Sequence, residues 1–203
     1  MHFEFFQQKH CEQQEMVEWN PVRVAAFNGD LEELRNLIAL GHEVDDRDEG
    51  GYTPLMYVCD DGEHECAHAL IEAGAAVDMV DNNGNTALMF ACESGHHECA
   101  QALIEAGAAV DMVDDDGDTA LMRACNFGHH ECARALINAG AAVDMVDIYG
   151  RTALMDACNF GHHECAQTLI DAHADLKLTN RDGKNALMIA CESSPSYLTQ
   201  SQC

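Results

Sequence analysis

Positively charged residues are scarce in this chain. Its 203 residues include 10 Lys and Arg against 36 Asp and Glu, which gives a formal net charge of −26. A surface so acidic repels the phosphates of nucleic acids and the headgroups of anionic membranes, so neither is expected as a partner. The electrostatic complement is a protein with a basic segment. The alternative is that the charge only keeps an apolar-rich chain in solution.

Long apolar runs are also absent. No stretch approaches the 18 apolar residues that a membrane-spanning helix needs. Residues 1–15 mix Phe with His, Glu, Gln and Lys and contain no continuous apolar segment, unlike a secretory signal. The 11 cysteines are odd in number, and without an export signal they favour a reducing compartment over a disulfide framework. An intracellular, cytoplasmic location is therefore expected.

The chain does contain a sequence that repeats every 33 residues. Two series of glycines share this spacing: Gly51, Gly84, Gly117, Gly150 and Gly183, and Gly29, Gly62, Gly95, Gly128 and Gly161. Two adjacent units read DNNGNTALMFACESGHHECAQALIEAGAAVDMV and DDDGDTALMRACNFGHHECARALINAGAAVDMV. Self-similarity at a fixed period of this length indicates a stacked array.

Each unit divides into the same local elements. Asp-x-x-Gly predicts a tight turn, with the glycine supplying a positive φ. Thr86 then stands at an N-cap position before a short helix over 87–92, and Gly95 ends that helix. A second helix is predicted over 97–105, and Gly107 ends it. Neither helix is long enough to be stable alone in water, so stability must come from stacked neighbours.

The motif D-x-x-G-x-T-A-L-M-x-A-C-x-x-G-H-x-E, followed by A-L-I-x-A-G-A-x-V-D, resembles the ankyrin repeat over residues 15–194. The resemblance implies an all-α solenoid of stacked helix-turn-helix-loop units. One departure is a methionine where the family has a histidine that ties neighbouring loops together: Met56, Met89, Met122, Met155 and Met188. We expect these thioethers to pack in the core instead.

The register sets the expected boundaries of the units. They are a leader with a short helix over 1–14, an N-terminal capping repeat over 15–47, repeats over 48–80, 81–113, 114–146 and 147–179, a truncated repeat over 180–194 and an irregular tail over 195–203. The last unit keeps the first-helix pattern and then has Ser194-Pro195 where Gly-His should follow. Either the remaining helix caps the stack, or the chain is a piece of a longer protein.

When the units are aligned with one another, each column of equivalent positions is either constant or variable. The variable columns are free of the packing demand that keeps the others constant. They fall at the turns and on one face of the first helix. In ankyrin arrays these two regions line a concave groove that holds partners, so the resemblance assigns the following residues to protein binding: Tyr52, Tyr57, Asp60, Asp61, Asn82, Asn83, Asn85, Phe90, Asp115, Asp116, Asp118, Arg123, Phe127, Ile148, Tyr149, Arg151, Asp156 and Phe160. Neutral drift at exposed sites is the alternative. It explains exposed Phe127, Ile148, Tyr149 and Phe160 less well, because exposed apolar clusters tend to mark contacts.

The recurring His-His-x-Cys pattern is the main chemical rival to this interpretation. Zinc binds to such ligands. However, Cys92 and Cys99 occupy columns that the family fills with apolar core residues, and the first His of each pair matches a structural turn histidine. The acidic run 114–118 does not fit an EF-hand, because in that register Met112 and Arg123 would fall at ligand positions. No metal ligand and no cofactor are therefore assigned.

No catalytic motif stands out from the repeats. A catalytic nucleophile is a single residue beside a base in a pocket, whereas here every Cys-His arrangement recurs, as scaffold residues do. No glycine-rich phosphate loop is present in the sequence. We therefore expect a monomeric, non-enzymatic scaffold or adaptor that holds a protein partner with a basic segment in its groove. The alternatives are the targeting portion of a larger enzyme or signalling protein, and a metal-binding protein.

Overall fold

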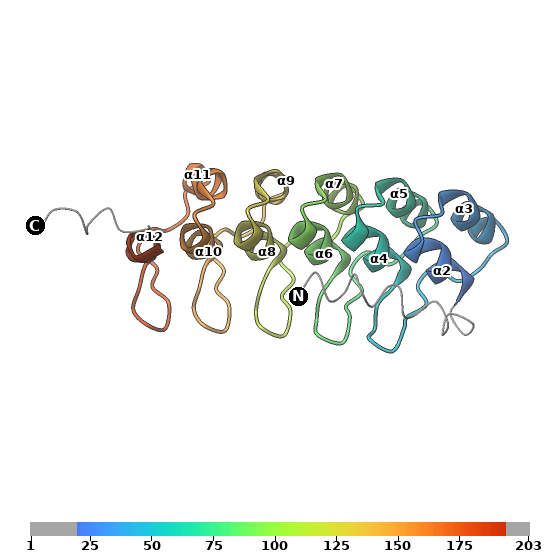
Figure 1. Ribbon diagram of the computed structural model, residues 1–203, viewed down its shortest axis with the longest axis horizontal. Helices are drawn as coiled ribbons and strands as arrows, with labels where there is room; N and C mark the ends of the chain where they lie inside the picture. The colour runs from blue at the N-terminus through green and yellow to red at the C-terminus, as the bar shows by residue number, and fades with distance from the viewer. Residues whose placement is uncertain (1–19, 194–203) are drawn as a thin grey trace, which may run out of the picture.

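The computed structural model describes residues 20–193 (Figure 1). Helices alternate along this part of the chain: α2 (Pro21–Phe27), α3 (Leu31–Ala39), α4 (Pro54–Asp61), α5 (His64–Glu72), α6 (Ala87–Ser94), α7 (His97–Glu105), α8 (Ala120–Phe127), α9 (His130–Asn138), α10 (Ala153–Phe160), α11 (His163–Asp171) and α12 (Ala186–Ser193). The helix expected in the leader over 1–14 and the tail over 195–203 lie outside the described residues.

The helices stack in two rows (Figure 1). One row contains the first helix of each unit, from α2 to α12, and the other contains the second helices, from α3 to α11. The loops between successive units all project from the side of the first helices. The all-α solenoid predicted from the 33-residue register is confirmed.

Each first helix is fixed at both ends by its own sequence. In α6, the Thr86 hydroxyl accepts a hydrogen bond from the Met89 backbone N–H at 3.2 Å, and Gly95 ends the helix in the left-handed conformation with φ 78°. The same threonine cap begins α4, α8 and α10. The caps satisfy backbone groups that would otherwise lack a partner, so helices of eight residues have defined ends.

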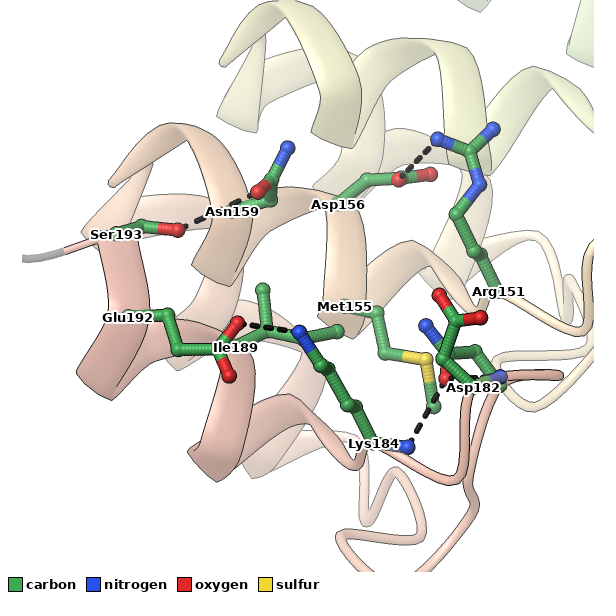
Figure 2. Close-up of a pocket in the computed structure, with 10 residues that line it drawn as sticks. Arg151, Met155, Asp156, Asn159, Asp182, Lys184, Ile189, Glu192 and Ser193 are labelled. Carbon is green, nitrogen blue, oxygen red and sulfur yellow. Dashed lines mark hydrogen bonds and ion pairs between the residues drawn. The ribbon is translucent and has the colours of Figure 1, made fainter.

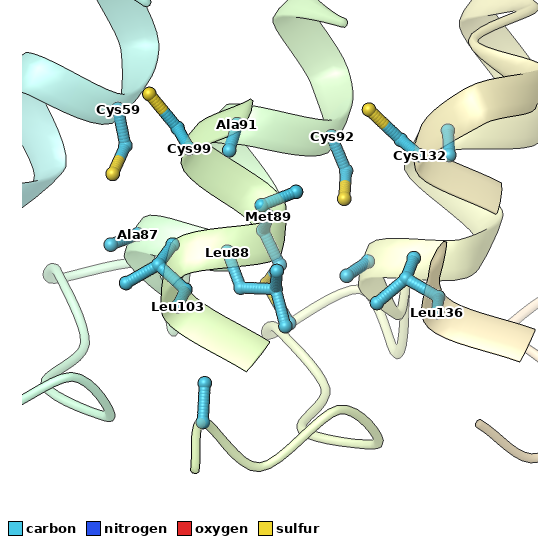
Figure 3. Close-up of a cluster of buried hydrophobic side chains, with 14 of the residues drawn as sticks. Cys59, Ala87, Leu88, Met89, Ala91, Cys92, Cys99, Leu103, Cys132 and Leu136 are labelled. Carbon is cyan, nitrogen blue, oxygen red and sulfur yellow. The ribbon is translucent and has the colours of Figure 1, made fainter. Parts of the chain in front are cut away.

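The core lies between the units as much as within them. Figure 3 shows Leu88, Cys92 and Leu103 pointing into the space between adjacent helix pairs, where each is at most 1% exposed. The thioether packing expected of the methionines is confirmed at Met89 and its equivalents Met56, Met122 and Met155, which are 1–2% exposed. Met188, at the end of the stack, is 52% exposed, because no following unit covers it within the described residues.

Neighbouring turns are joined by backbone hydrogen bonds. The N–H groups of Asn82, Asp115, Ile148 and Arg181 each donate to a carbonyl of the preceding turn at 2.9–3.0 Å. These bonds need no side chain, so the loops are tied together although the family's loop histidine is replaced. In the described part of the chain, no helix is long and apolar enough to cross a bilayer.

Candidate protein-interaction surface

A buried aspartate organises each turn and determines which of the following residues project. Asp81 is 3% exposed, and its Oδ1 accepts hydrogen bonds from the backbone N–H groups of Asn83 and Asn85, both at 2.8 Å. Asp114 and Asp147 do the same in the next two turns. Because the first residue of each turn faces inward, the next two side chains must face solvent.

The structure places the predicted turn-tip residues accordingly. The exposed members are Asn82, Asn83, Asp115, Asp116, Ile148 and Tyr149. Ile148 is 39% exposed and Tyr149 is 54% exposed, and exposed large apolar side chains that lie together tend to mark contact sites. The Arg151 guanidinium lies 5.5 Å from the centre of the Tyr149 ring, a cation–π contact that orients the ring.

Two phenylalanines extend this exposed apolar set onto the first helices. Phe127 is the last residue of α8 and is 47% exposed, and Phe160 is the last residue of α10 and is 54% exposed. They occupy the same position in adjacent units. Together with Ile148 and Tyr149 on the intervening turn, they are four large apolar side chains on the row of first helices and turns that remain open to solvent.

Three other predicted contact residues serve the packing between repeats. Tyr52 lies 5.4 Å from Tyr57 and 5.1 Å from Phe90, centre to centre, and Phe27 meets Tyr57 edge-on at 5.6 Å. Burial, followed by the charge of nearby Asp81, raises the pKa of Tyr52 to about 12. Burial and the hydrogen bond that its hydroxyl donates to Asp48 raise the pKa of Tyr57 as well. This aromatic cluster spans three units and is half-buried, so it stabilises the stack more than it offers contact area.

Arg123 is likewise turned back onto its own chain. Its guanidinium pairs with Glu93 on the preceding first helix and with Asp114, and it also donates to the Asn85 side chain at 3.1 Å. Asp118 lies 3.8 Å from its Nε, and burial raises the pKa of that carboxyl. The cation predicted to contact a partner is therefore already neutralised by neighbouring acids.

Asp156 departs furthest from the sequence interpretation. It was expected on the contact surface, but it is 3% exposed and pairs with Arg151 at 3.3 Å (Figure 2). Burial raises its pKa to about 7, against the lowering effect of Arg151. Arg151 also binds Asp147 at 2.7 Å. A residue so enclosed cannot touch a partner directly, and it acts by holding Arg151 in place.

The remaining predicted residues are acidic. Asp61 is exposed at the end of α4, and half-buried Asp60 accepts a hydrogen bond from Ser94 of the next unit at 3.0 Å. With Asp115 and Asp116 they belong to a stretch, from position 48 to 122, that contains no Lys or Arg. The surface thus carries an acidic zone at Asp60, Asp61, Asp115 and Asp116 and, beside it, an apolar zone around Phe127 and Phe160.

A family model described as ankyrin repeats (3 copies) matches residues 22–114 and 104–180. The chain belongs to the ankyrin repeat family. No curated protein matches this ankyrin chain in a sequence search. Ankyrin repeats are in general modules for protein–protein interaction.

The recurring cysteines and histidines form no metal site in the described residues, where no group of three or more potential ligands comes together. The thiols instead pair between units, as Cys59 does with Cys99 (Figure 3). That hydrogen bond and complete burial raise the pKa of the Cys59 thiol well above its ordinary value. The first histidine of each pair packs on the preceding unit: His162 Nε2 lies 3.1 Å from the Asn126 carbonyl oxygen. These residues therefore support the stack.

Proposed function

We propose that this ankyrin array is a non-catalytic scaffold that binds a protein partner on a recognition surface. We define this surface as the turn tips at 82–83, 115–116 and 148–149 together with Phe127 and Phe160. The exposed apolar side chains of Phe127 on α8, of Ile148 and Tyr149 on the turn before α10, and of Phe160 on α10 carry the proposal. They are held on a rigid stack and cost little conformational entropy to dock, because their backbone is already fixed.

The charge of the same surface defines the partner's chemistry. The acidic tips favour a partner segment rich in Lys or Arg, and the apolar zone beside them favours one or two large apolar anchors next to that basic segment. Arg123 and Arg151 add little positive charge to the surface, because acids on the chain itself already pair with them. A basic segment would therefore meet few competing cations along the acidic zone.

Affinity capture with two matched triple variants tests the proposal. The first, Phe127→Ala, Tyr149→Ala and Phe160→Ala, removes the apolar zone. The control, Leu40→Ala, Ile170→Ala and Leu176→Ala, removes exposed apolar side chains outside the recognition surface. We expect the first variant to lose its partners at least tenfold relative to the control. Equal retention by both would reject the recognition surface while leaving the fold intact.

The basic segment needs a separate test on the captured partner. Asp115→Asn with Asp116→Asn should weaken binding several-fold and reduce its dependence on salt, because exposed charges attract less strongly at high ionic strength. Glu72→Gln with Glu105→Gln removes the same charge from the ends of second helices and serves as the control. Binding that is equally salt-dependent in both variants would contradict a basic partner segment at these tips.

A further inference from the structure

Cysteines from adjacent units meet in pairs in the core of the stack. In each pair, one cysteine lies on a first helix and the other on the second helix of the next unit, 40 residues further along the chain. Each first-helix thiol forms a hydrogen bond to its partner, and Figure 3 shows two of the pairs between neighbouring units. All six side chains are 0% exposed. We call them the interunit thiol pairs: Cys59 with Cys99, Cys92 with Cys132, and Cys125 with Cys165.

A second contact brings the sulfurs of the first pair to the same place in the core. Cys99 Sγ lies 4.0 Å from the carbonyl oxygen of Val58, the residue before Cys59 on α4. The second-helix thiol therefore packs directly against the helix that carries its partner. A disulfide joins its two sulfurs at about 2.0 Å, so sulfurs already in contact are the starting geometry that the bond needs.

The hydrogen bond makes the two thiols of a pair chemically unequal. Together with burial, it raises the pKa of Cys59, which keeps its proton, and it lowers the pKa of Cys99, which accepts the bond. The pKa values of Cys125 and Cys165 differ in the same direction for the same reason. Because the thiolate is the form that reacts with oxidants, the second-helix cysteine is the more reactive member of these pairs. The first-helix thiol stands beside it, in position to close a bond.

The second unit contains a buried cysteine that lies outside the pairs. Cys66 occupies the same second-helix position as Cys99 and is 1% exposed. The register places Ala26 opposite it, where the other units have a first-helix cysteine. Burial, followed by the charges of nearby glutamates, raises the pKa of the Cys66 thiol to about 11. The chain thus supplies its own control, a buried thiol without a facing thiol at that position.

We propose that the interunit thiol pairs are oxidation sites at which a hydroperoxide forms a disulfide between adjacent units. The peroxide transfers one oxygen to the second-helix sulfur, which becomes a sulfenic acid, and leaves as an alcohol, or as water when the oxidant is hydrogen peroxide. The first-helix sulfur then attacks that sulfur and forms the S–S bond. The proton of the attacking thiol and the hydroxyl of the sulfenic acid leave as water. Two thiols are oxidised for each peroxide reduced.

The three bonds would join four consecutive units covalently, from 48–80 to 147–179. In a stacked array each unit is held by its neighbours, so the array opens locally where one interface fails, and such opening also admits an oxidant to the buried sulfurs. A disulfide across the interface opposes further opening. In a reducing compartment such bonds are transient, as they are in redox sensors. The inference does not depend on the recognition surface, because all six cysteines lie in the core.

Disulfide mapping of the full chain after timed exposure to hydrogen peroxide tests the proposal. Remaining thiols are blocked with a maleimide, and the chain is cut at acidic residues, which separates the two cysteines of every pair. We expect mass spectrometry to recover the three interunit pairs as the main linked peptides. We also expect oxidation to raise the midpoint of thermal unfolding by several degrees, and reduction with dithiothreitol to reverse the rise.

Two matched variants separate the pairs from other buried thiols. Cys92→Ala removes one member of a pair, whereas Cys66→Ala removes a buried cysteine outside the pairs. Oxidised Cys92→Ala should lack the bond to Cys132, retain the other two and show a smaller rise of the thermal midpoint. Oxidised Cys66→Ala should retain all three bonds and the full rise.

Three outcomes would overturn the proposal. One is a set of disulfides that links other cysteines. Another is a folded chain whose paired thiols stay reduced while exposed Cys191 is oxidised. The third is a set of interunit bonds that forms only in urea, since those bonds would then belong to the unfolded chain. If Cys92→Ala does not fold, mapping of the wild-type chain decides alone, because it needs no substitution.

Discussion

The helices α6 and α12 have almost the same sequence, ALMFACES and ALMIACES, but very different surroundings. Leu88 and Met89 in α6 are each 1% exposed, whereas Leu187 and Met188 in α12 are 70% and 52% exposed. The difference comes from the neighbours, since α6 lies between two units and α12 has a described unit on one side only. Burial in this protein is therefore a property of the stack and is not set by the repeat sequence alone.

The largest expected effect is a difference between two leucine truncations. Leu88→Ala should lower the free energy of unfolding by about 2–5 kcal/mol, because it leaves a cavity between packed units. Leu187→Ala, at the equivalent position, should cost less than about 1 kcal/mol, because the side chain is already largely in water. Urea unfolding followed by circular dichroism measures both. Similar losses would mean that α12 is covered as completely as α6.

A pair of glycine variants sharpens the comparison at the turns. Gly95→Ala and Gly161→Ala both place an alanine at positive φ, 78° and 73°, which costs each of them about 1 kcal/mol. Only the Cβ at position 95 also overlaps a histidine ring of the next unit, His129. Gly95→Ala should therefore unfold at a lower urea concentration than Gly161→Ala. Equal midpoints would contradict the contact of that turn with the next repeat.

Asp156 lies in the repeat next to the end of the stack, and its buried carboxyl should make the stability of the protein depend on pH. Its folded-state pKa, raised to about 7, lies above the usual value of about 3.9 in an unfolded chain. The folded state is thus favoured by protonation, and this contribution is lost as the pH rises through about 7. Asp156→Asn should exceed the wild type in stability by about 1–3 kcal/mol at pH 8. The gain should shrink toward pH 5, and a gain independent of pH would show that Asp156 titrates normally.

The smallest contrast concerns two ion pairs. Arg123 links Glu93 to Asp114 in a half-buried network between units, whereas Lys184 pairs with Glu192 in water at the end of the stack. Arg123→Ala should cost about 1–2 kcal/mol, because it leaves several acids close together without a cation. Lys184→Ala should cause no measurable change in the urea midpoint. A larger loss for Lys184→Ala would reverse the comparison.

The sequence predicted the fold well because its signals are local. Thr86 and Gly95 define a helix through contacts within ten residues, and these recur in every full unit. The positions that vary between units also identified Phe127 and Phe160 correctly as exposed. Such features depend on backbone geometry and hydrophobic spacing, both of which are visible in a single repeat.

The polar contacts between units could not be predicted in this way. Arg123 and Asp156 lie in the same variable column as Phe90, and variation alone suggested that all three face a partner. Arg123 instead bends back to Glu93, 30 residues away, and Asp156 is enclosed beside Arg151. The direction of a long side chain depends on charges that a neighbouring unit supplies. It therefore cannot be predicted from how a position varies between repeats.

Hydrogen exchange on the complex with a captured partner tests the central claim most directly, namely that the turn tips and first helices are the surface left free for recognition. Exchange is compared, peptide by peptide, between the free and the bound array. The account predicts added protection over residues 115–127 and 148–160, with no change in α7 and α9 on the opposite row. Protection confined to α7 and α9 would contradict it.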